Sequence, residues 1–182
     1  MSHSISAGGL EIDHRDPFEV IDYDPAWADM FSNERDLIAN AIGEYTMDIE
    51  HVGSTSIPGL AAKPIIDIQV VVEDFSNLTQ CVKAMQNIGY RYKGTTGIEG
   101  REYFKRPLFH VHMVQVGNDE YTRKRLFLAY LRTHDDVRQE YAELKRRLVA
   151  KWAGYPNAHL EYNSDKTEFI MGVLARAGYE SK

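Results

Sequence analysis

Apolar and polar positions alternate along this chain with two periods, one typical of helices and one typical of strands. Over residues 24–43 apolar side chains recur at helical spacing, with Asp24 and Pro25 suited to the start of a helix and Gly43 to its end. The same reasoning predicts further helices, and these cover 76–89, 119–134, 136–154 and 163–179.

Two of these predicted helices carry more detailed expectations. The basic triplet 145–147 in the fourth helix is assigned to the helix surface. The last helix is expected to be capped near Ser164 or Asp165 and to stop at Gly178. The fourth helix also presents one apolar face, made of Val137, Tyr141, Leu144 and Leu148.

Strand patterns occupy the middle of the chain. Residues 64–72 are rich in β-branched side chains and almost continuously hydrophobic, which favours a central strand. Strands followed by a run of helices indicate an α+β domain, with a mixed sheet flanked by helices and a C-terminal helical layer. We predict a flexible segment over 1–16 and a single domain over 17–180. The other strands are expected over 47–52, 90–94, 101–106 and 108–116.

The composition narrows the possible functions. A net charge of -6 argues against a nucleic acid as the partner, because non-specific binding to phosphate backbones needs a basic surface. One cysteine excludes an internal disulfide and a multi-cysteine zinc site. No apolar run approaches the roughly 18 residues of a membrane span, and the start of the chain lacks the pattern of a secretory signal. We therefore expect a cytoplasmic protein without a membrane partner.

The segment "HVGSTSIPGLAAKPIIDIQVVV", residues 51–72, carries the most informative pattern. Gly53, Ser54, Thr55 and Ser56 offer close backbone approach and three hydroxyl groups, a combination that can cradle a phosphate. The segment has no Walker A pattern, which argues against a P-loop kinase. The alternative is an ordinary connection between two strands.

A carboxylate inside the hydrophobic strand then needs an explanation. Burying Asp67 without a partner would cost several kcal/mol, so it requires a cation, a strong donor or a solvent-filled site. Lys63 can pair with it or contact a phosphate. Arg101 can form the wall of an anion pocket or be solvated, and Lys166 can bind phosphate or lie on the surface near a cap.

These motifs resemble the GrpB family, also called UPF0157, which is similar to the nucleotidyltransferase superfamily. The resemblance rests on Gly53-Ser54 followed by Asp67, and on "YDPAWADMF", "FHVHMV" and "YNSDKTEFIMGVLARA". It covers roughly residues 18–177. It implies a nucleotidyltransferase-like fold that binds a nucleotide or another phosphorylated small molecule. Some members of the family are fused to dephospho-CoA kinase.

The resemblance also implies a divalent metal, with Mg²⁺ or Mn²⁺ favoured and Zn²⁺ allowed. In the superfamily two or three carboxylates hold two metal ions, but Gln69 stands where the second carboxylate is expected. His110 and His112 stand where the third is sought, and imidazole ligands suit Zn²⁺, Mn²⁺ or Fe²⁺. The metal ligands implied are thus Asp67, Gln69, His110 and His112.

Three functions remain open on this pattern. The first is an altered metal-dependent nucleotidyltransferase in which Asp67 and His112 are catalytic, His112 as a ligand or general base. The second is a pocket that binds a nucleotide without catalysis. The third is an interaction module with a protein partner, linked to coenzyme A metabolism by analogy with the fused forms.

Overall fold

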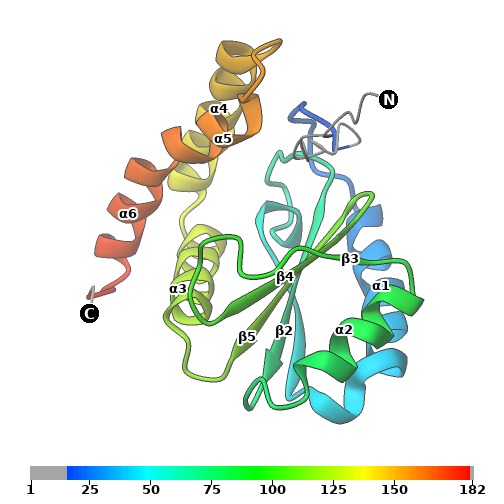
Figure 1. Cartoon of the computed structure of the whole chain (residues 1–182). Helices are drawn as coiled ribbons and strands as arrows, with labels where there is room; N and C mark the ends of the chain where they lie inside the picture. Colours follow the sequence, from blue (N-terminus) through cyan, green and yellow to red (C-terminus); the bar gives the residue numbers. More distant parts are fainter. Residues whose placement is uncertain (1–15, 181–182) are drawn as a thin grey trace, which may run out of the picture.

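A five-stranded mixed sheet forms the centre of the molecule, with α1 and α2 on one face and α3 on the other (Figure 1). The computed structural model describes residues 16–180, so residues 1–15 of the predicted flexible segment lie outside it. The strands run in the order β1-β2-β5-β4-β3, with β2 and β5 parallel and the other pairs antiparallel. Their bounds are β1 Asp48–Val52, β2 Ile66–Val72, β3 Arg91–Tyr92, β4 Arg101–Arg106 and β5 Phe109–Gln115.

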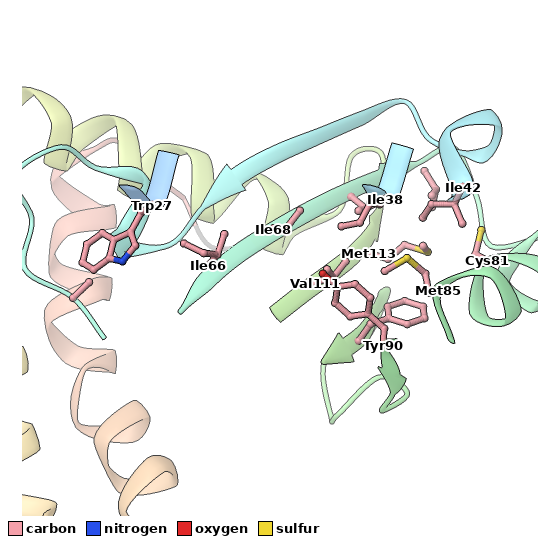
Figure 2. Close-up of a cluster of buried hydrophobic side chains, with 14 residues drawn as sticks. Trp27, Ile38, Ile42, Ile66, Ile68, Cys81, Met85, Tyr90, Val111 and Met113 are labelled. Carbon is pink, nitrogen blue, oxygen red and sulfur yellow. The ribbon is translucent and has the colours of Figure 1, made fainter. Parts of the chain in front are cut away.

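The main hydrophobic core lies between the sheet and the two helices α1 (Ala26–Ile42) and α2 (Leu78–Asn87). Alternate residues of β2, among them Ile66 and Ile68, point into this core together with Val111 of β5 (Figure 2). Because side chains on a strand alternate between faces, the intervening residues of β2 must face the other helical layer. The predicted central strand and the α+β architecture are confirmed.

The other layer begins with α3 (Asp119–Thr133) and continues with α4 (Asp135–Trp152), α5 (Ala158–Asp165) and α6 (Thr167–Arg176). A second buried cluster joins α3, α4 and α6 to the chain between β1 and β2, where the 3₁₀ turn Ser54–Ser56 lies. The cluster contains Val52, Ile57, Leu60, Ala61, Leu128, Leu131, Val137, Tyr141, Ala142 and Val173. A further 3₁₀ turn, Gly43–Tyr45, follows α1. No helix within 16–180 has the length and apolar character needed to cross a membrane.

The predicted last helix is wrong in one respect. Ser164 and Asp165 do not cap it but end the separate helix α5, and Lys166 occupies the turn before α6. The Asp165 carboxylate accepts hydrogen bonds from Lys151 and from the indole of Trp152 at 2.7 and 2.9 Å, which fastens α5 to α4. This break depends on a contact with α4, so helical periodicity within 163–179 does not reveal it.

Candidate functional site

Polar side chains from three adjacent strands gather on the sheet face that is turned toward α3. Asp67 of β2 pairs in register with His110 of β5, and Gln69 pairs with His112. On the other side of β5, His110 pairs with Lys105 of β4. Residues paired across strands share a face, so these groups form one contiguous polar patch. The structure thus brings together Asp67, Gln69, His110 and His112, the four residues that the family resemblance implies as metal ligands.

The carboxylate of Asp67 is held by the two histidines. Its Oδ1 lies 3.3 Å from His112 Nε2 and 3.8 Å from His110 Nδ1. Burial alone would raise the pKa of Asp67, but the His112 hydrogen bond and the neighbouring positive charges outweigh it and lower the pKa to about 2. Burial, with the charge of Lys124, lowers the pKa of His112 to about 4. At neutral pH, therefore, an uncharged His112 donates Nε2–H to an ionised Asp67.

The predicted phosphate loop is folded mostly onto itself. The Thr55 hydroxyl is buried, and it donates to the Ile65 carbonyl at 3.0 Å while contacting His51 Nε2 at 3.0 Å. The Ser56 hydroxyl donates to the Gly53 carbonyl at 2.7 Å. Ser54 differs, because its side chain acts on the phenol of Tyr141 of α4. The Ser56 hydroxyl also accepts a hydrogen bond from Arg132 of α3 at 3.3 Å. Ser54 and Ser56 thus both face the C-terminal helical layer.

Three lysines lie next to this patch, two of them against Tyr162 of α5 and the third close enough for their charges to act on it. Lys63 Nζ lies 4.1 Å from the centre of the Tyr162 ring, and Lys166 Nζ lies 4.4 Å from it. Lys145 Nζ donates to the Ala61 carbonyl and lies 4.6 Å from the ring of Tyr141. Two of these lysines were predicted as ligand-binding residues, and the structure places them together.

The predicted surface position of Lys145 is wrong, because the residue is buried. Its side chain is only 2% exposed, whereas the side chains of Arg146 and Arg147 are 47% and 67% exposed. Burial lowers the pKa of Lys145 well below its usual range, and the positive charges of Lys166, Arg146 and Lys63 lower it further. Burial likewise lowers the pKa of both Lys63 and Lys166 to about 8.

Arg101 lies away from the lysines. It stands four residues before Lys105 on β4, roughly 13 Å along the strand. Its guanidinium donates to the Thr95 carbonyl at 3.2 Å and to the Thr96 hydroxyl, and it lies 3.5 Å from Glu120 of α3. These contacts hold the loop before β4 against α3, so Arg101 does not join Lys63 and Lys166.

Asp16 is a member of the site that the sequence patterns did not predict. Its carboxylate Oδ2 lies 2.6 Å from Lys105 Nζ and 3.1 Å from His110 Nε2. Burial alone would raise the pKa of Asp16, but these two partners lower it to about 2. No local pattern marks Asp16, because its partners are about 90 residues away in the chain.

The residues of this site do not fit the paired metal ions of the superfamily. Gln69 is fully buried, and neither atom of its amide has a hydrogen-bond partner among the described residues. Neighbouring strands β2 and β5 contribute only Asp67 as a carboxylate. Within residues 16–180 no three His, Cys, Asp or Glu side chains are arranged to hold a metal ion. A metal cofactor therefore stays a prediction.

A surface pocket lies at the other end of β2 and is separate from this site. Its volume is about 150 Å³, and its lining includes Glu73, Asp74 and the buried Cys81. Acidic side chains dominate its polar lining, so it offers no counterpart to the lysine cluster.

The comparison with protein families decides the assignment. The family described as "GrpB protein" matches residues 17–176. The chain belongs to the GrpB family. The UPF0157 protein YqkA of Bacillus subtilis is 39% identical over 156 residues, 84% of this chain but only 45% of YqkA. The UPF0157 protein BH1888 of Halalkalibacterium halodurans is 32% identical and matches 90% of this chain and 84% of BH1888.

The solved structure of GrpB from Enterococcus faecalis has the same fold. It superposes with a TM-score of 0.79 at 34% identity and covers 87% of this chain and 96% of that one. A weaker likeness to Cid1 poly(U) polymerase has a TM-score of 0.48 at 13% identity, over 73% of this chain and 44% of that chain. Dephospho-CoA kinase of Mycolicibacterium paratuberculosis is 33% identical over 79 residues, 42% of this chain and 19% of that protein. The GrpB matches agree with the family that the sequence motifs resemble.

Proposed function

We propose that this GrpB-family protein binds a nucleotide or a related phosphorylated small molecule between the polar sheet face and helices α4 to α6. The observation that carries the proposal is that the buried Lys145 lies near Lys63 and Lys166, which both lie against the ring of Tyr162. Among the described residues, no carboxylate lies within ion-pair distance of these three ammonium groups. A buried ammonium group needs an anionic partner, and a phosphoryl group is the anion that a small molecule most commonly supplies.

Of the three lysines, Lys145 has the greatest need of an anionic partner. Its Nζ donates to a single backbone carbonyl, that of Ala61, and it is surrounded by the positive charges that lower its pKa. A phosphoryl group beside it would supply acceptor oxygens and a compensating charge. Ser54 lies close to the same place, because it acts on Tyr141, the ring over which Lys145 lies, and its hydroxyl adds a neutral donor.

Nucleotidyl transfer is the finer form of this proposal, with Asp67 and His112 as the reacting groups. A neutral His112 that donates Nε2–H to Asp67 keeps Nδ1 as an acceptor, and this buried atom has no hydrogen-bond partner among the described residues. A histidine oriented in this way by a carboxylate can act as a general base at its other nitrogen. Because β2 and β5 supply a single carboxylate, binding without catalysis is the form of the proposal that is tested first. An interaction role linked to coenzyme A metabolism is the second candidate, supported by the segment shared with dephospho-CoA kinases.

Thermal unfolding in the presence of ATP, GTP, CTP, UTP or coenzyme A tests the proposal. Each ligand is measured with Mg²⁺, Mn²⁺, Zn²⁺ or EDTA, because a requirement for metal would favour transfer over simple binding. A ligand at 100 times its Kd adds about 2.7 kcal/mol to the free energy of unfolding. We expect at least one ligand to raise the melting temperature of the wild type.

Two variants of α4 make the test specific. Lys145→Met removes the buried charge with a side chain of similar length, and we expect it to abolish the ligand-induced shift. Arg147→Met removes an exposed charge from the same helix, 67% exposed in the structure, and the shift should persist. A shift that survives in Lys145→Met contradicts the proposed site, and the absence of any shift in the wild type favours the interaction role.

A further inference from the structure

The segment that leads into α1 crosses the site and is anchored at several points. The backbone of Ile21 pairs with that of Ala62 through two hydrogen bonds of 2.9 Å. The ring of Phe18 packs edge-on against Tyr162 at 5.8 Å and against His159 at 4.8 Å, and Lys63 Nζ lies 5.2 Å from its centre. Because Phe18 contacts both Tyr162 and Lys63, this segment is part of the wall of the proposed ligand site.

Asp16, two residues before Phe18, is fixed against the sheet. Its side chain is 7% exposed, and Oδ2 alone makes both contacts, with Lys105 at 2.6 Å and His110 at 3.1 Å. The other oxygen, Oδ1, is also buried and has no hydrogen-bond partner among the described residues. A buried carboxylate oxygen normally accepts a hydrogen bond, so this oxygen lacks a donor.

The surroundings of the Asp16 carboxylate relate it to the proposed ligand site. His110 links the two acids of the site, since its Nε2 faces Asp16 and its Nδ1 faces Asp67. The negative charge of Asp16 also acts on Lys63, one of the three lysines proposed to bind phosphate. An ionised carboxylate repels a phosphoryl group and attracts a hydroxyl donor, so Asp16 and the lysines select different parts of one molecule.

We propose that Asp16 is a specificity-determining residue whose Oδ1 accepts a hydrogen bond from a hydroxyl group of the phosphorylated ligand. The inference rests on the proposed function and makes it narrower. The ligand class is then a phosphorylated polyol or sugar, which includes nucleotides, and not inorganic phosphate or a simple alkyl phosphate.

Three probes separate the two requirements. Inorganic phosphate reports on the lysine cluster alone, propyl phosphate adds a carbon chain, and glycerol 3-phosphate has the same chain with two hydroxyl groups. The full-length protein is titrated with each probe, and binding is monitored by ³¹P NMR to obtain the affinities. We expect the wild type to bind glycerol 3-phosphate at least tenfold more tightly than propyl phosphate, as a hydrogen bond to a charged acceptor would give.

Variants of the segment then assign the preference to its residue. Asp16→Ala should bring the ratio of the two affinities close to one without weakening the binding of inorganic phosphate. Asp16→Asn, which keeps the size and a neutral acceptor, should give an intermediate ratio and guards against misfolding of the alanine variant. Asp22→Ala is the matched control, because Asp22 lies in the same segment, is 92% exposed and pairs with Arg146 on the surface.

The outcomes distinguish this inference from the proposed function. Tight binding of all three probes with no preference for glycerol 3-phosphate overturns the role of Asp16 and leaves the phosphate site in place. A preference that survives in Asp16→Ala also overturns it. If none of the probes binds, both the phosphate site and the role of Asp16 are refuted.

Discussion

The carboxylate of Asp67 lies in the space that a side chain on Gly53 would fill. A Cβ atom added to Gly53 would stand 2.4 Å from Asp67 Oδ2 and 2.9 Å from Asp67 Cβ. Gly53 also has a φ of 74°, a backbone conformation that favours glycine. The glycine of the Gly-Ser motif is thus needed for the placement of Asp67, whatever the loop binds.

Gly53→Ala should therefore destabilise the protein more than an alanine substitution at another glycine of positive φ. Gly59 provides that control, since its φ is 78° and a Cβ atom added there would meet open space, with no surrounding atom within 4 Å. Both alanine variants bear the penalty of a positive φ, about 1–2 kcal/mol, and it is larger at Gly53 because its ψ of -176° lies in a region populated almost only by glycine. Overpacking against Asp67 adds roughly 1–3 kcal/mol to Gly53→Ala. Urea unfolding measures both, and equal losses would show that Asp67 moves aside freely.

Ligand binding should be coupled to proton uptake. The pKa of Lys63 and Lys166 is about 8 in the free protein, and a bound phosphoryl group would raise it. Affinity should then increase as the pH falls from about 10 to 8, where the free lysines are partly neutral and the bound ones are charged. Calorimetry at pH 8.5 in buffers of different ionisation enthalpy counts these protons.

The control for this coupling is Lys63→Arg. Arginine stays protonated throughout this range, so the variant should bind with fewer protons taken up. The phosphate itself is fully ionised at pH 8.5 and does not contribute. Proton release on binding, or an affinity independent of pH, would contradict the charge state assigned to these lysines.

The free energy of unfolding should decrease as the pH falls from 6.5 to 4. Burial lowers the pKa of His51, as of His112, to about 4, while both titrate near 6.5 in the unfolded chain. In this window the unfolded state binds more protons, so stability rises with pH by up to about 1.4 kcal/mol per pH unit for each histidine. Urea midpoints at pH 7, 6 and 5 measure the slope.

His51→Gln isolates one of the two contributions. Glutamine keeps a donor that can reach the Thr55 hydroxyl, which lies 3.0 Å from His51 Nε2. The variant should therefore fold normally. Between pH 4 and 6.5 its free energy of unfolding should depend less steeply on pH, because the contribution of one histidine is removed. A slope identical to that of the wild type would mean that His51 is charged in the folded protein.

Gln69 should tolerate an apolar replacement. Its amide is fully buried without a hydrogen-bond partner among the described residues, an arrangement that costs about 1–3 kcal/mol. Gln69→Leu removes the polar atoms with little change in volume and should raise the free energy of unfolding by about 1 kcal/mol. Gln69→Glu restores the acid of the superfamily pattern and should lower it, because a second charge would be buried near Asp67. A large loss in Gln69→Leu would instead indicate that water or a ligand binds the amide.

Several features of the site were predictable because they depend on local period alone. A two-residue repeat on a strand fixes that Asp67 and Gln69 share a face, and the same holds for His110 and His112. The β-branched run over 64–72 identified the central strand that carries the first pair. The pairing of β2 with β5 then places the face that carries Asp67 and Gln69 beside the face that carries His110 and His112.

Lys145 shows where the local signal was present but outweighed. It lies four residues after Tyr141 and three before Leu148, so helical spacing places it on the buried face of α4. Its charge favoured the surface in the sequence analysis. A lysine on an apolar stripe is a signal that could have identified it.

Short segments of the sequence were enough to predict the α+β architecture, the resemblance to the GrpB family, and the strand positions of Asp67, Gln69 and the two histidines. They also showed a glutamine at position 69, where the superfamily that the motifs resemble has an acid. These features follow from periodicity and motif spacing. Three other features exist only in the folded protein: Asp16 reaches His110, Lys63 and Lys166 meet at Tyr162 with Lys145 nearby, and α5 and α6 are separate helices. Each of these depends on contacts between segments far apart in the chain, and the free energy of such contacts comes from burial and charge in the folded state, which no local pattern encodes.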